Sequence, residues 1–367
     1  MKKKILIGFL NREMKGAIPT ITRAFIEGLR DKYDFIPFFM DRRHRKGKAE
    51  FNALNLYYLL KHHLSWIIEI IRNRPDIVHF PVTSYWNMEK SILFLLTARI
   101  MGVKKVVGHL HGGAFEHFWN SCSPLRRKIA HSVLSRLDAF IVLSKHWEVV
   151  ATSALKINRN KVFEVNNPIE RELENSFRNF TRKYSSEKIL ITSISNLNKS
   201  KGILSSIRAL GKLQEDYRYD IVGKETEKGF VERLARDISE GELGNKVKIA
   251  GEKYGIDKII LLKETDIYLL PSHIENFPLA VIEAACAAIP IITTPVGALP
   301  EFFTHMENIY YVEPGNVEEI RDAVEFMIHN RSERERMGKA AREVFLRKLA
   351  REKIMEQLDR VYTRICR

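Results

Sequence analysis

Short apolar runs alternate with longer helical patterns along almost the whole chain, and this alternation constrains the fold more than any other feature. Runs rich in Ile, Val and Phe are typical of strands buried on both faces, as in a parallel sheet. In the first half such runs fall at residues 4–9, 34–40, 76–81, 105–111, 139–144 and 161–165. In the second half they fall at residues 188–195, 219–223, 246–251, 266–272, 290–295 and 308–313. The sequence therefore predicts an α/β fold with two doubly wound parallel sheets.

The length of the chain supports two domains, because 367 residues exceed the size at which one hydrophobic core usually keeps growing. Pro168 bars helix continuation, and the polar segment after it is typical of a surface connection. We therefore expect a first domain at residues 1–170 and a second at 171–345, facing each other across a cleft. The tail favours helix, and its last helix, at 346–367, is expected to pack back on the first domain.

Positive charge is concentrated in the first half of the chain. Residues 1–170 hold 28 Lys and Arg against 14 Asp and Glu, a net +14, whereas the other 197 residues hold 32 against 31. An acidic partner such as anionic lipid or a phosphorylated carrier would explain this, and a generally solubilising surface is the alternative. Nucleic acid is the least favoured partner, because no aromatic and basic recognition module is found.

Two classes of protein are disfavoured by the sequence. No uncharged apolar run reaches the roughly eighteen residues that a transmembrane helix needs. The three cysteines are widely spaced and form no C-x-x-C pair, which argues against zinc, a disulfide framework or a redox motif. The expected compartment is therefore the reducing cytosol.

Ligands of open parallel sheets collect at the carboxyl ends of the strands, so polar groups in the loops that follow the apolar runs are candidates for ligand binding. The loop with Gly16 would let a phosphate approach, and a plain strand-to-helix turn is the alternative. His111 follows the fourth run, where it could contact a sugar hydroxyl or be a structural loop histidine. Lys199 and Lys201 lead into a helix, where they could meet a pyrophosphate or be ordinary solvated lysines.

The stretch PSHIENFPLAVIEAACAAIPII, from Pro271 to Ile292, carries two carboxylates in an otherwise apolar setting. Pro278 suits the first turn of a helix from Leu279 to Ala288. Glu275 then precedes this helix, and Glu283 lies about one and a half turns inside it. With seven residues between them, the two glutamates are expected to reach different parts of one elongated ligand instead of forming a single acid and base pair.

The chain resembles the retaining glycosyltransferases of family four, also called glycosyl transferases group 1. The donor-site signature of that family is matched by the two glutamates together with Pro271-Ser272, Phe277-Pro278-Leu279, Glu283-Ala284, Pro290-Ile291-Ile292, Val296-Gly297 and Pro300-Glu301. The resemblance covers nearly the whole chain, because weaker signals fall in the expected order at Lys15-Gly16-Ala17, His111, Asn167-Pro168, Lys201-Gly202, Gly223 and Gly251. It implies the GT-B fold of two Rossmann-like domains, a UDP- or GDP-linked sugar donor, and transfer with retention and without a metal or other cofactor.

The resemblance also implies a role for each matching residue. Glu283 would hold the ribose hydroxyls, and Glu275 would contact the donor sugar. Lys201 would neutralise the pyrophosphate, helped by the helix after Gly297, and His111 would contact the transferred sugar. The expected catalytic residues are therefore Glu275, His111 and Lys201, and the expected donor-binding residues are Gly16, Ala17, Asn196, Lys199, Lys201, Tyr254, Asn276, Phe277, Pro278, Leu279 and Glu283.

One departure from the family lies beside the expected phosphate site. Where the family usually has Gly-Arg-Leu shortly before the Lys-Gly pair, this chain has Ser195-Asn196-Leu197, so one of two expected cations is missing. Lys199 could substitute, although its ammonium does not reproduce a bidentate guanidinium.

A dense basic run, DRRHRKGK at residues 41–48, precedes an amphipathic, aromatic-rich helix expected within 51–74. This arrangement suits an anionic membrane surface, and a core-facing helix after a solvated loop is the alternative. The candidate residues for contact with acceptor or membrane are Arg42, Arg43, Arg45, Lys46 and Lys48.

The expected function is transfer of a sugar from a nucleotide sugar to a hydroxyl of a glycan or lipid-linked saccharide, in the synthesis of cell-surface polysaccharide or glycoconjugate. The expected location is the cytoplasm or the inner face of the cell membrane. The alternatives are a nucleotide-sugar epimerase of the same fold and a non-catalytic sugar-binding partner. A phosphorylase is disfavoured, because the chain has no recognisable cofactor-lysine signature and is short for one.

Overall fold

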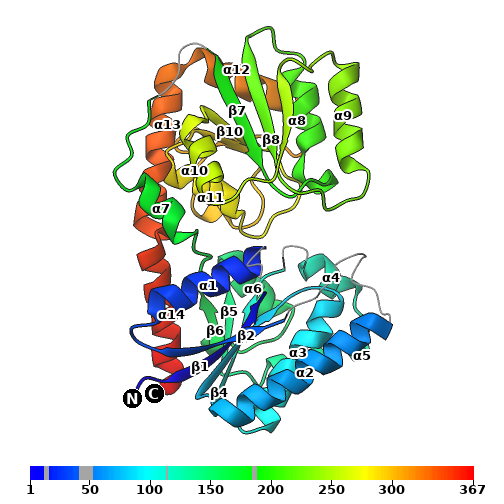
Figure 1. The fold of residues 1–367 in the computed structure, drawn as a ribbon, viewed down its shortest axis with the longest axis vertical. Coiled ribbons are helices and arrows are strands. Elements are labelled where there is room, and N and C mark those ends of the chain that lie inside the picture. The colour runs from blue at the N-terminus through cyan, green and yellow to red at the C-terminus, as the bar shows by residue number, and fades with distance from the viewer. Residues whose placement is uncertain (12–15, 41–52, 113–114, 184–187) are drawn as a thin grey trace. The chain divides into compact units, whose positions relative to one another are not determined.

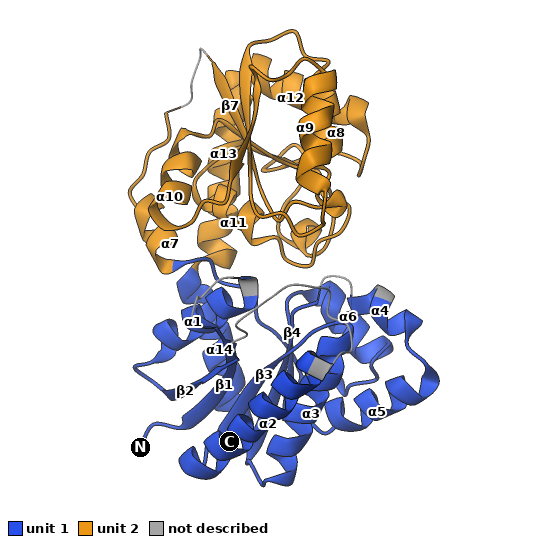
Figure 2. Ribbon diagram, turned by 45° about the vertical axis from the view of Figure 1, so that its right-hand side comes forward, with its two compact units in different colours: residues 1–170, 351–367 blue, residues 171–350 orange. Residues whose placement is uncertain are grey.

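The chain forms two compact units in the computed structural model, which describes residues 1–11, 16–40, 53–112, 115–183 and 188–367. Unit 1 consists of Met1–Glu170 together with Arg351–Arg367, and unit 2 consists of Arg171–Ala350. Figure 1 shows the course of the chain, and Figure 2 colours the two units separately. Each unit has its own six-stranded sheet.

The sheet of unit 1 is parallel throughout, with strand order β2-β1-β3-β4-β5-β6. Its strands β3 and β5 are buried at every residue, which is why they appear in the sequence as unbroken apolar runs. All six runs predicted for this half are strands: β1 (Lys4–Leu10), β2 (Asp34–Phe39), β3 (Ile77–Val82), β4 (Lys105–Leu110), β5 (Ala139–Val142) and β6 (Val162–Glu164).

Helices connect these strands and cover the sheet of unit 1 (Figure 1). They are α1 (Ala17–Leu29), α2 (Ala53–Asn73), α3 (Trp86–Ile100), α4 (Phe115–Ser121), α5 (Pro124–Leu134) and α6 (Lys145–Ser153), followed by the 3₁₀ turn η1 (Arg159–Lys161). No helix in the described ranges is long and apolar enough to cross a membrane.

The sheet of unit 2 is also parallel, with strand order β12-β11-β10-β7-β8-β9. All six predicted runs are again strands: β7 (Ile189–Ile194), β8 (Tyr217–Val222), β9 (Val247–Gly251), β10 (Ile267–Leu270), β11 (Ile291–Thr293) and β12 (Tyr310–Tyr311). From β7 the strands progress outward through β8 and β9 on one side and through β10 to β12 on the other. The strand order therefore reverses between β7 and β10, where ligands collect in sheets of this kind.

The helical elements of unit 2 surround this sheet. They are α7 (Arg171–Phe177), η2 (Lys199–Lys201), α8 (Ile203–Leu210), α9 (Phe230–Glu240), α10 (Gly255–Glu264), α11 (Leu279–Cys286), η3 (Leu299–Glu301), α12 (Val317–His329), α13 (Arg331–Val344) and the π-helical turn η4 (Phe345–Leu349).

The last helix, α14 (Arg351–Cys366), belongs to unit 1 and packs beside α1 (Figure 1). It begins at Arg351 and not at residue 346, because η4 continues α13 within unit 2 and Ala350 then adopts an extended conformation with φ −60° and ψ 143°. Gln357 fixes the helix to unit 1, accepting from the backbone N–H of Asn166 at 3.0 Å and donating to the side-chain oxygen of the same residue at 3.1 Å.

A cluster of three histidines joins α14 to the sheet of unit 1. His79 of β3 lies between the hydroxyl of Tyr362, 2.6 Å from its Nδ1, and His109 of β4, 3.2 Å from its Nε2. The ring of His111 lies against His109, with centroids 4.0 Å apart. Burial lowers the pKa of His79 to about 3 and that of His109 well below its usual value, so both are neutral at physiological pH.

We expect unit 1 to lose stability in mild acid because of these buried histidines. The unfolded chain protonates both histidines below about pH 6.5, whereas in the folded unit His79 is protonated only near pH 3 and the pKa of His109 also lies well below its usual value. Their contribution is therefore fully present above pH 6.5 and is lost as the pH falls from there towards 3, by about 2 kcal/mol for His79 at pH 5. All four tryptophans lie in unit 1, so urea unfolding followed by tryptophan fluorescence between pH 7 and 5 measures the loss.

In the variant His109→Gln, unfolding should take up about one proton fewer, because glutamine does not titrate. The free energy of unfolding should therefore depend less steeply on pH. The control is Phe25→Leu, since Phe25 packs on the rings of His79 and His109. This variant should lower stability equally at each pH through lost packing. If the pH dependence of the unfolding free energy were unchanged in His109→Gln, the buried histidines would not be the cause of the acid sensitivity.

Candidate donor site

The candidate site lies where the loops after β7 and β10 meet, at the reversal of strand order in unit 2. The backbone N–H of His273 donates to the carbonyl of Ser200 at 2.8 Å and joins the two loops. Gly202 has φ +70°, and a Cβ at this position would collide with the carbonyl of Pro271. Glycine is therefore required for the loops to approach so closely.

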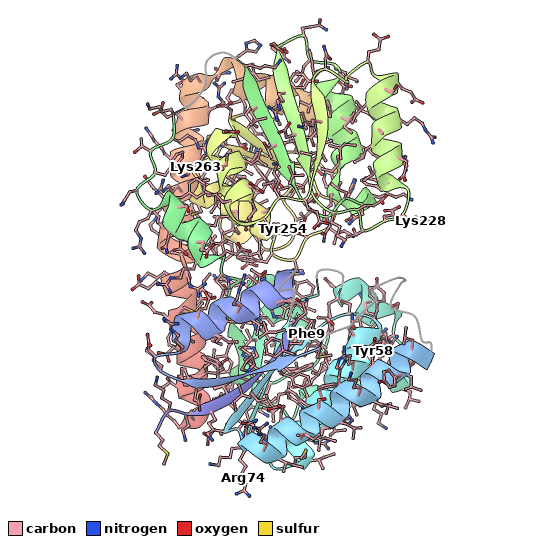
Figure 3. The ribbon with its side chains drawn as sticks, in the orientation of Figure 1. Phe9, Tyr58, Arg74, Lys228, Tyr254 and Lys263 are labelled. Atoms are coloured by element: carbon pink, nitrogen blue, oxygen red, sulfur yellow. The ribbon has the colours of Figure 1, made fainter. Side chains whose placement is uncertain are left out.

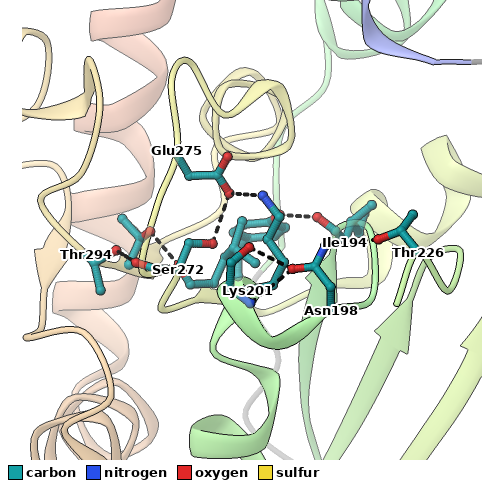
Figure 4. Close-up of polar contacts among 11 residues, drawn as sticks. Ile194, Asn198, Lys201, Thr226, Ser272, Glu275 and Thr294 are labelled. Atoms are coloured by element: carbon teal, nitrogen blue, oxygen red, sulfur yellow. Dashed lines mark hydrogen bonds and ion pairs between the residues drawn. The ribbon is translucent and has the colours of Figure 1, made fainter. Parts of the chain in front are cut away.

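The close approach brings Lys201 and Glu275 into contact, as Figure 4 shows. The Lys201 Nζ donates to Glu275 Oε1 at 2.7 Å, and the Ser272 hydroxyl donates to the same oxygen at 2.9 Å. The two charged side chains are only 16% and 13% exposed, so the pair lies largely out of water. Charges of opposite sign are thereby held at the carboxyl edge of the sheet, where each can face charge that develops on a ligand.

Asn198 fixes the loop that carries Lys201. Its side-chain oxygen accepts from the N–H of Ser200 at 3.0 Å and from the Ser200 hydroxyl at 2.7 Å, and its amide donates to Thr226 at 3.0 Å (Figure 4). Neither Asn198 nor Ser272 was among the site residues expected from the sequence, although Ser272 belongs to the matching signature. An asparagine two residues before a loop serine is a common turn signal that could have identified the first of them.

Glu283 has a lysine partner of its own. It lies in the second turn of α11, which is preceded by Pro278, and its carboxylate accepts from Nζ of Lys258 on α10 at 2.7 Å. The side chain of Glu283 is 8% exposed and that of Lys258 is 10% exposed. Lys258 was not identified from the sequence, although a lysine amid the apolar residues of GIDKIILL was a usable signal, because a buried lysine requires a partner. The two glutamates thus have separate partners.

Asn276 and the loop after β11 lie next to Glu275. The carbonyl of Asn276 accepts from the N–H of Ala298 at 2.9 Å. Gly297 has φ +61°, and a Cβ there would also collide with the carbonyl of Asn276, so both its backbone conformation and its surroundings favour glycine. The carboxamide of Asn276 is buried and has no hydrogen-bond partner among the residues that the structure describes. The helix expected after Gly297 is only the three-residue turn η3, too short to supply a helix dipole, and this expectation was wrong.

Phe277, Pro278 and Leu279 lie between the two glutamates at the start of α11. Phe277 and Pro278 are buried, whereas Leu279 is partly exposed. Together they fix the spacing of Glu275 and Glu283, one at the end of the loop and the other inside the helix.

Lys199 does not lie with the Lys201 and Glu275 pair. Its side chain is 67% exposed and pairs with Glu227 at 3.1 Å. Asn196, in the place of the family's arginine, is exposed. The structure therefore places one ammonium, that of Lys201, against Glu275, and directs the other towards an acidic side chain on the surface.

Tyr254 immediately precedes α10, the helix that carries Lys258. Its side chain is half-exposed, and its hydroxyl donates to Glu252 at 2.5 Å. This hydrogen bond and partial burial raise the pKa of Tyr254 to about 12.

The remaining candidates belong to unit 1. His111 follows β4 and donates its backbone N–H to Val82 at 2.9 Å. Part of its side-chain surface reaches water, but the groups packed around the ring desolvate it enough to lower its pKa to about 3. Gly16, with φ +107°, precedes α1, whose first residue is Ala17. Both positions are at carboxyl ends of strands, as predicted. The basic candidates Arg42, Arg43, Arg45, Lys46 and Lys48 lie outside the described residues.

Within the described ranges, one group of side chains has the spacing of metal ligands. It consists of Glu215, Glu325 and His329, whose ligand atoms lie within 4.8 Å of one another. His329 already bonds Glu215 at 2.7 Å, and Glu325 and His329 are exposed, so the group is adequately explained as a surface ion pair beside a further acid.

We expect Lys258→Met to destabilise unit 2 by about 3–5 kcal/mol, because it removes the ammonium that pairs with the buried Glu283 carboxylate. Adding Glu283→Gln to that variant should recover most of the loss. Urea unfolding followed by circular dichroism measures both, and tryptophan fluorescence separates the transition of unit 1.

The control for this pair is Lys339→Met, which breaks the exposed pair of Lys339 and Glu335 at 2.6 Å. It should change stability by less than about 1 kcal/mol. If Lys258→Met and Lys339→Met lowered the free energy of unfolding equally, the pair of Lys258 and Glu283 would behave like an exposed pair, which would contradict its burial.

The chain is similar in sequence to known glycosyltransferases. Residues 175–344 match the family described as Glycosyl transferases group 1. The chain is 28% identical over 184 residues to the N-acetyl-alpha-D-glucosaminyl L-malate synthase of Bacillus anthracis, covering 50% of this chain and 47% of that protein. It is 25% identical over 294 residues to the O-antigen biosynthesis glycosyltransferase WclY of Escherichia coli, covering 77% of each chain.

Similarity to solved structures extends over both units. Anabaena Alr3699/HepE, in complex with UDP and glucose, matches with a TM-score of 0.76 and 17% identity, covering 99% of this chain and 100% of that chain. The chain spans about half the length of several curated relatives that it matches, at 47%, 50% and 51%. The match to the glycosyl transferases group 1 family thus falls within unit 2, and the two Rossmann-like units have the GT-B fold.

Proposed function

We propose that this protein transfers a sugar from a nucleotide sugar to a hydroxyl of a glycan or lipid-linked saccharide, with retention and without a metal, in the synthesis of cell-surface polysaccharide. The observation that carries the proposal is the pair of Lys201 and Glu275 at the strand-order reversal, with Glu283 on the adjoining helix. The O-antigen role in the name of WclY supports the type of product. UDP and glucose in HepE support a UDP-linked donor, and GDP remains the alternative.

The proposed mechanism follows from the charges of the reaction. Breaking the bond between the sugar and the diphosphate builds positive charge on the sugar and negative charge on the leaving group. Lys201 would neutralise the diphosphate, and Glu275 would accept from a sugar hydroxyl and oppose the positive charge. The acceptor hydroxyl would attack from the side on which the diphosphate leaves.

Donor binding would rearrange the pair that Lys201 and Glu275 form. A diphosphate oxygen offers the Lys201 ammonium the same kind of partner as the carboxylate, so the two compete for it. Once Lys201 has turned to the phosphate, Glu275 keeps its bond from Ser272 and has room for a sugar hydroxyl. Glu283 would hold the ribose, with Lys258 fixing its carboxylate, and Tyr254 would lie beside the base.

The other candidates have supporting roles in this proposal. The backbone N–H groups of Asn276 and Phe277 would hold sugar hydroxyls, and Pro278 and Leu279 would set the start of α11. From unit 1, His111 would contact the transferred sugar, and the amides around Gly16 and Ala17 would contact the phosphate. The acceptor would bind to the basic first unit at the cytoplasmic face of the membrane.

We expect Lys201→Met to lower kcat/KM for transfer or donor hydrolysis by about 10²–10³, because a charge aimed at the leaving group is lost. The matched control is Lys199→Met, which removes an exposed ammonium two residues away and should change kcat/KM less than about threefold. Release of UDP or GDP from a panel of nucleotide sugars is the measurement. An effect of Lys199→Met as large as that of Lys201→Met would show that Lys199 replaces the missing arginine.

The same panel separates the alternatives. An epimerase would alter the sugar without releasing the nucleotide, and a non-catalytic binding partner would give a thermal shift without either reaction. No response to any nucleotide sugar would contradict the transferase proposal.

A further inference from the structure

Helix α2 is apolar on two opposite faces, and one of them points to solvent. Trp66 and Ile70 are buried on the inner face, where the Trp66 indole donates to the carbonyl of Phe94 at 3.0 Å. The outer face carries a stripe of five large apolar side chains that are 55–62% exposed: Tyr57, Leu60, Leu64, Ile68 and Ile71. We call these five residues the outer stripe.

The spacing of three, four, four and three residues places the outer stripe along one line of the helix, about 20 Å long. Figure 3 shows α2 on the surface of unit 1, with Tyr58 near its first turns and Arg74 just beyond its end. A helix at the surface of a soluble unit normally presents polar residues to water. Single exposed leucines need no explanation, but a continuous stripe indicates a binding surface.

The charges beside the outer stripe indicate what kind of surface it binds. Lys61 and Arg72 lie one position beyond Leu60 and Ile71, so they flank the stripe on one side, and both are exposed. Arg74 follows the helix. Glu69 is the helix's one acidic residue, and its carboxylate accepts from Asn73 at 2.6 Å.

Unit 1 as a whole carries the positive charge of the protein. It holds 33 Lys and Arg against 17 Asp and Glu, a net +16, whereas unit 2 holds 27 against 28, a net −1. A second copy of unit 1 would bring a like charge against the stripe and be repelled, whereas an anionic surface would be attracted.

We propose that the outer stripe of α2 inserts into the headgroup region of a bilayer that contains anionic lipid. A helix with an apolar face and flanking Lys and Arg lies in the plane of such an interface, bound by apolar burial and by attraction to the lipid charge. The two sequence interpretations of this helix are therefore not exclusive, because its inner face packs on the core while the outer face is available to lipid. This inference adds a partner to the proposed function and does not depend on the transfer reaction.

The test is co-sedimentation of the full-length protein with vesicles, without donor or acceptor. The wild type should bind vesicles of phosphatidylcholine mixed with phosphatidylglycerol, and bind phosphatidylcholine alone only weakly. Leu64→Gln/Ile68→Gln should lower the partition coefficient about tenfold or more, since it removes two apolar insertions at unchanged charge. Lys61→Gln/Arg72→Gln should lower it about fivefold per residue and weaken its salt dependence.

The matched control is Ile260→Gln, which removes an isoleucine that is 47% exposed on α10 of unit 2 and should leave vesicle binding unchanged. Unchanged fluorescence of Trp66 and the other tryptophans, all in unit 1, verifies that the variants of α2 are folded.

Three results would overturn the proposal. The first is wild-type protein that fails to sediment with anionic vesicles, and the second is a Leu64→Gln/Ile68→Gln variant that binds them like the wild type. The third is a wild-type dimer in light scattering that the variant converts to monomer without any vesicle binding, which would make the stripe an interface between copies. A failed transfer assay would not affect the sedimentation or light-scattering results, because neither experiment contains a sugar donor or acceptor.

Discussion

The contact between the Gly202 backbone and the carbonyl of Pro271 is the constraint on which the candidate site depends. It exists because β7 and β10 are neighbours in the sheet although 72 residues lie between the end of β7 and the start of β10. It also requires Gly202, which can adopt a left-handed conformation without a side chain in the way. Any other residue there would push the loops apart and separate Lys201 from Glu275. The site is therefore a product of sheet topology as much as of its charged residues.

Each of the two glutamates of the site is paired with a lysine before any ligand is present. Partly buried ion pairs of this kind contribute little net stability, because desolvation offsets most of the attraction. The two ion pairs are better explained by a role in ligand binding. A diphosphate and a ribose bring the oxygen atoms that an ammonium and a carboxylate favour, so a ligand can exchange into pairs whose geometry is already set. The difference in exposure between Lys201 and Lys199 follows the same logic, because only the first is held inside the site.

The strands were predictable from the sequence because those buried on both faces, such as β3, β5 and β10, appear as unbroken apolar runs. The order of motifs along the chain placed Lys201 and Glu275 after strand ends and Glu283 inside the helix that follows. The partners were not predictable. Lys258 meets Glu283 only because α10 and α11 pack together, and Glu227 attracts Lys199 from 28 residues further along the chain. The start of α14 was misplaced because the tail from residue 331 contains no proline and favours helix throughout. The break at Ala350 reflects the docking of α14 on unit 1.

The separate roles proposed for Glu275 and Glu283 can be tested most directly by calorimetric titration. The wild type, Glu283→Gln and Glu275→Gln are each titrated with UDP and with the UDP-sugar to which the protein responds in the panel of nucleotide sugars. Glu283→Gln should weaken both ligands alike, by about tenfold to a hundredfold, because a charged hydrogen bond to the ribose is lost. Glu275→Gln should leave UDP binding equal or tighter, since Lys201 is released to the phosphate, and should weaken only the sugar-bearing ligand. Equal loss of UDP affinity in both variants would contradict the separate roles proposed for the sugar and ribose ends of the site.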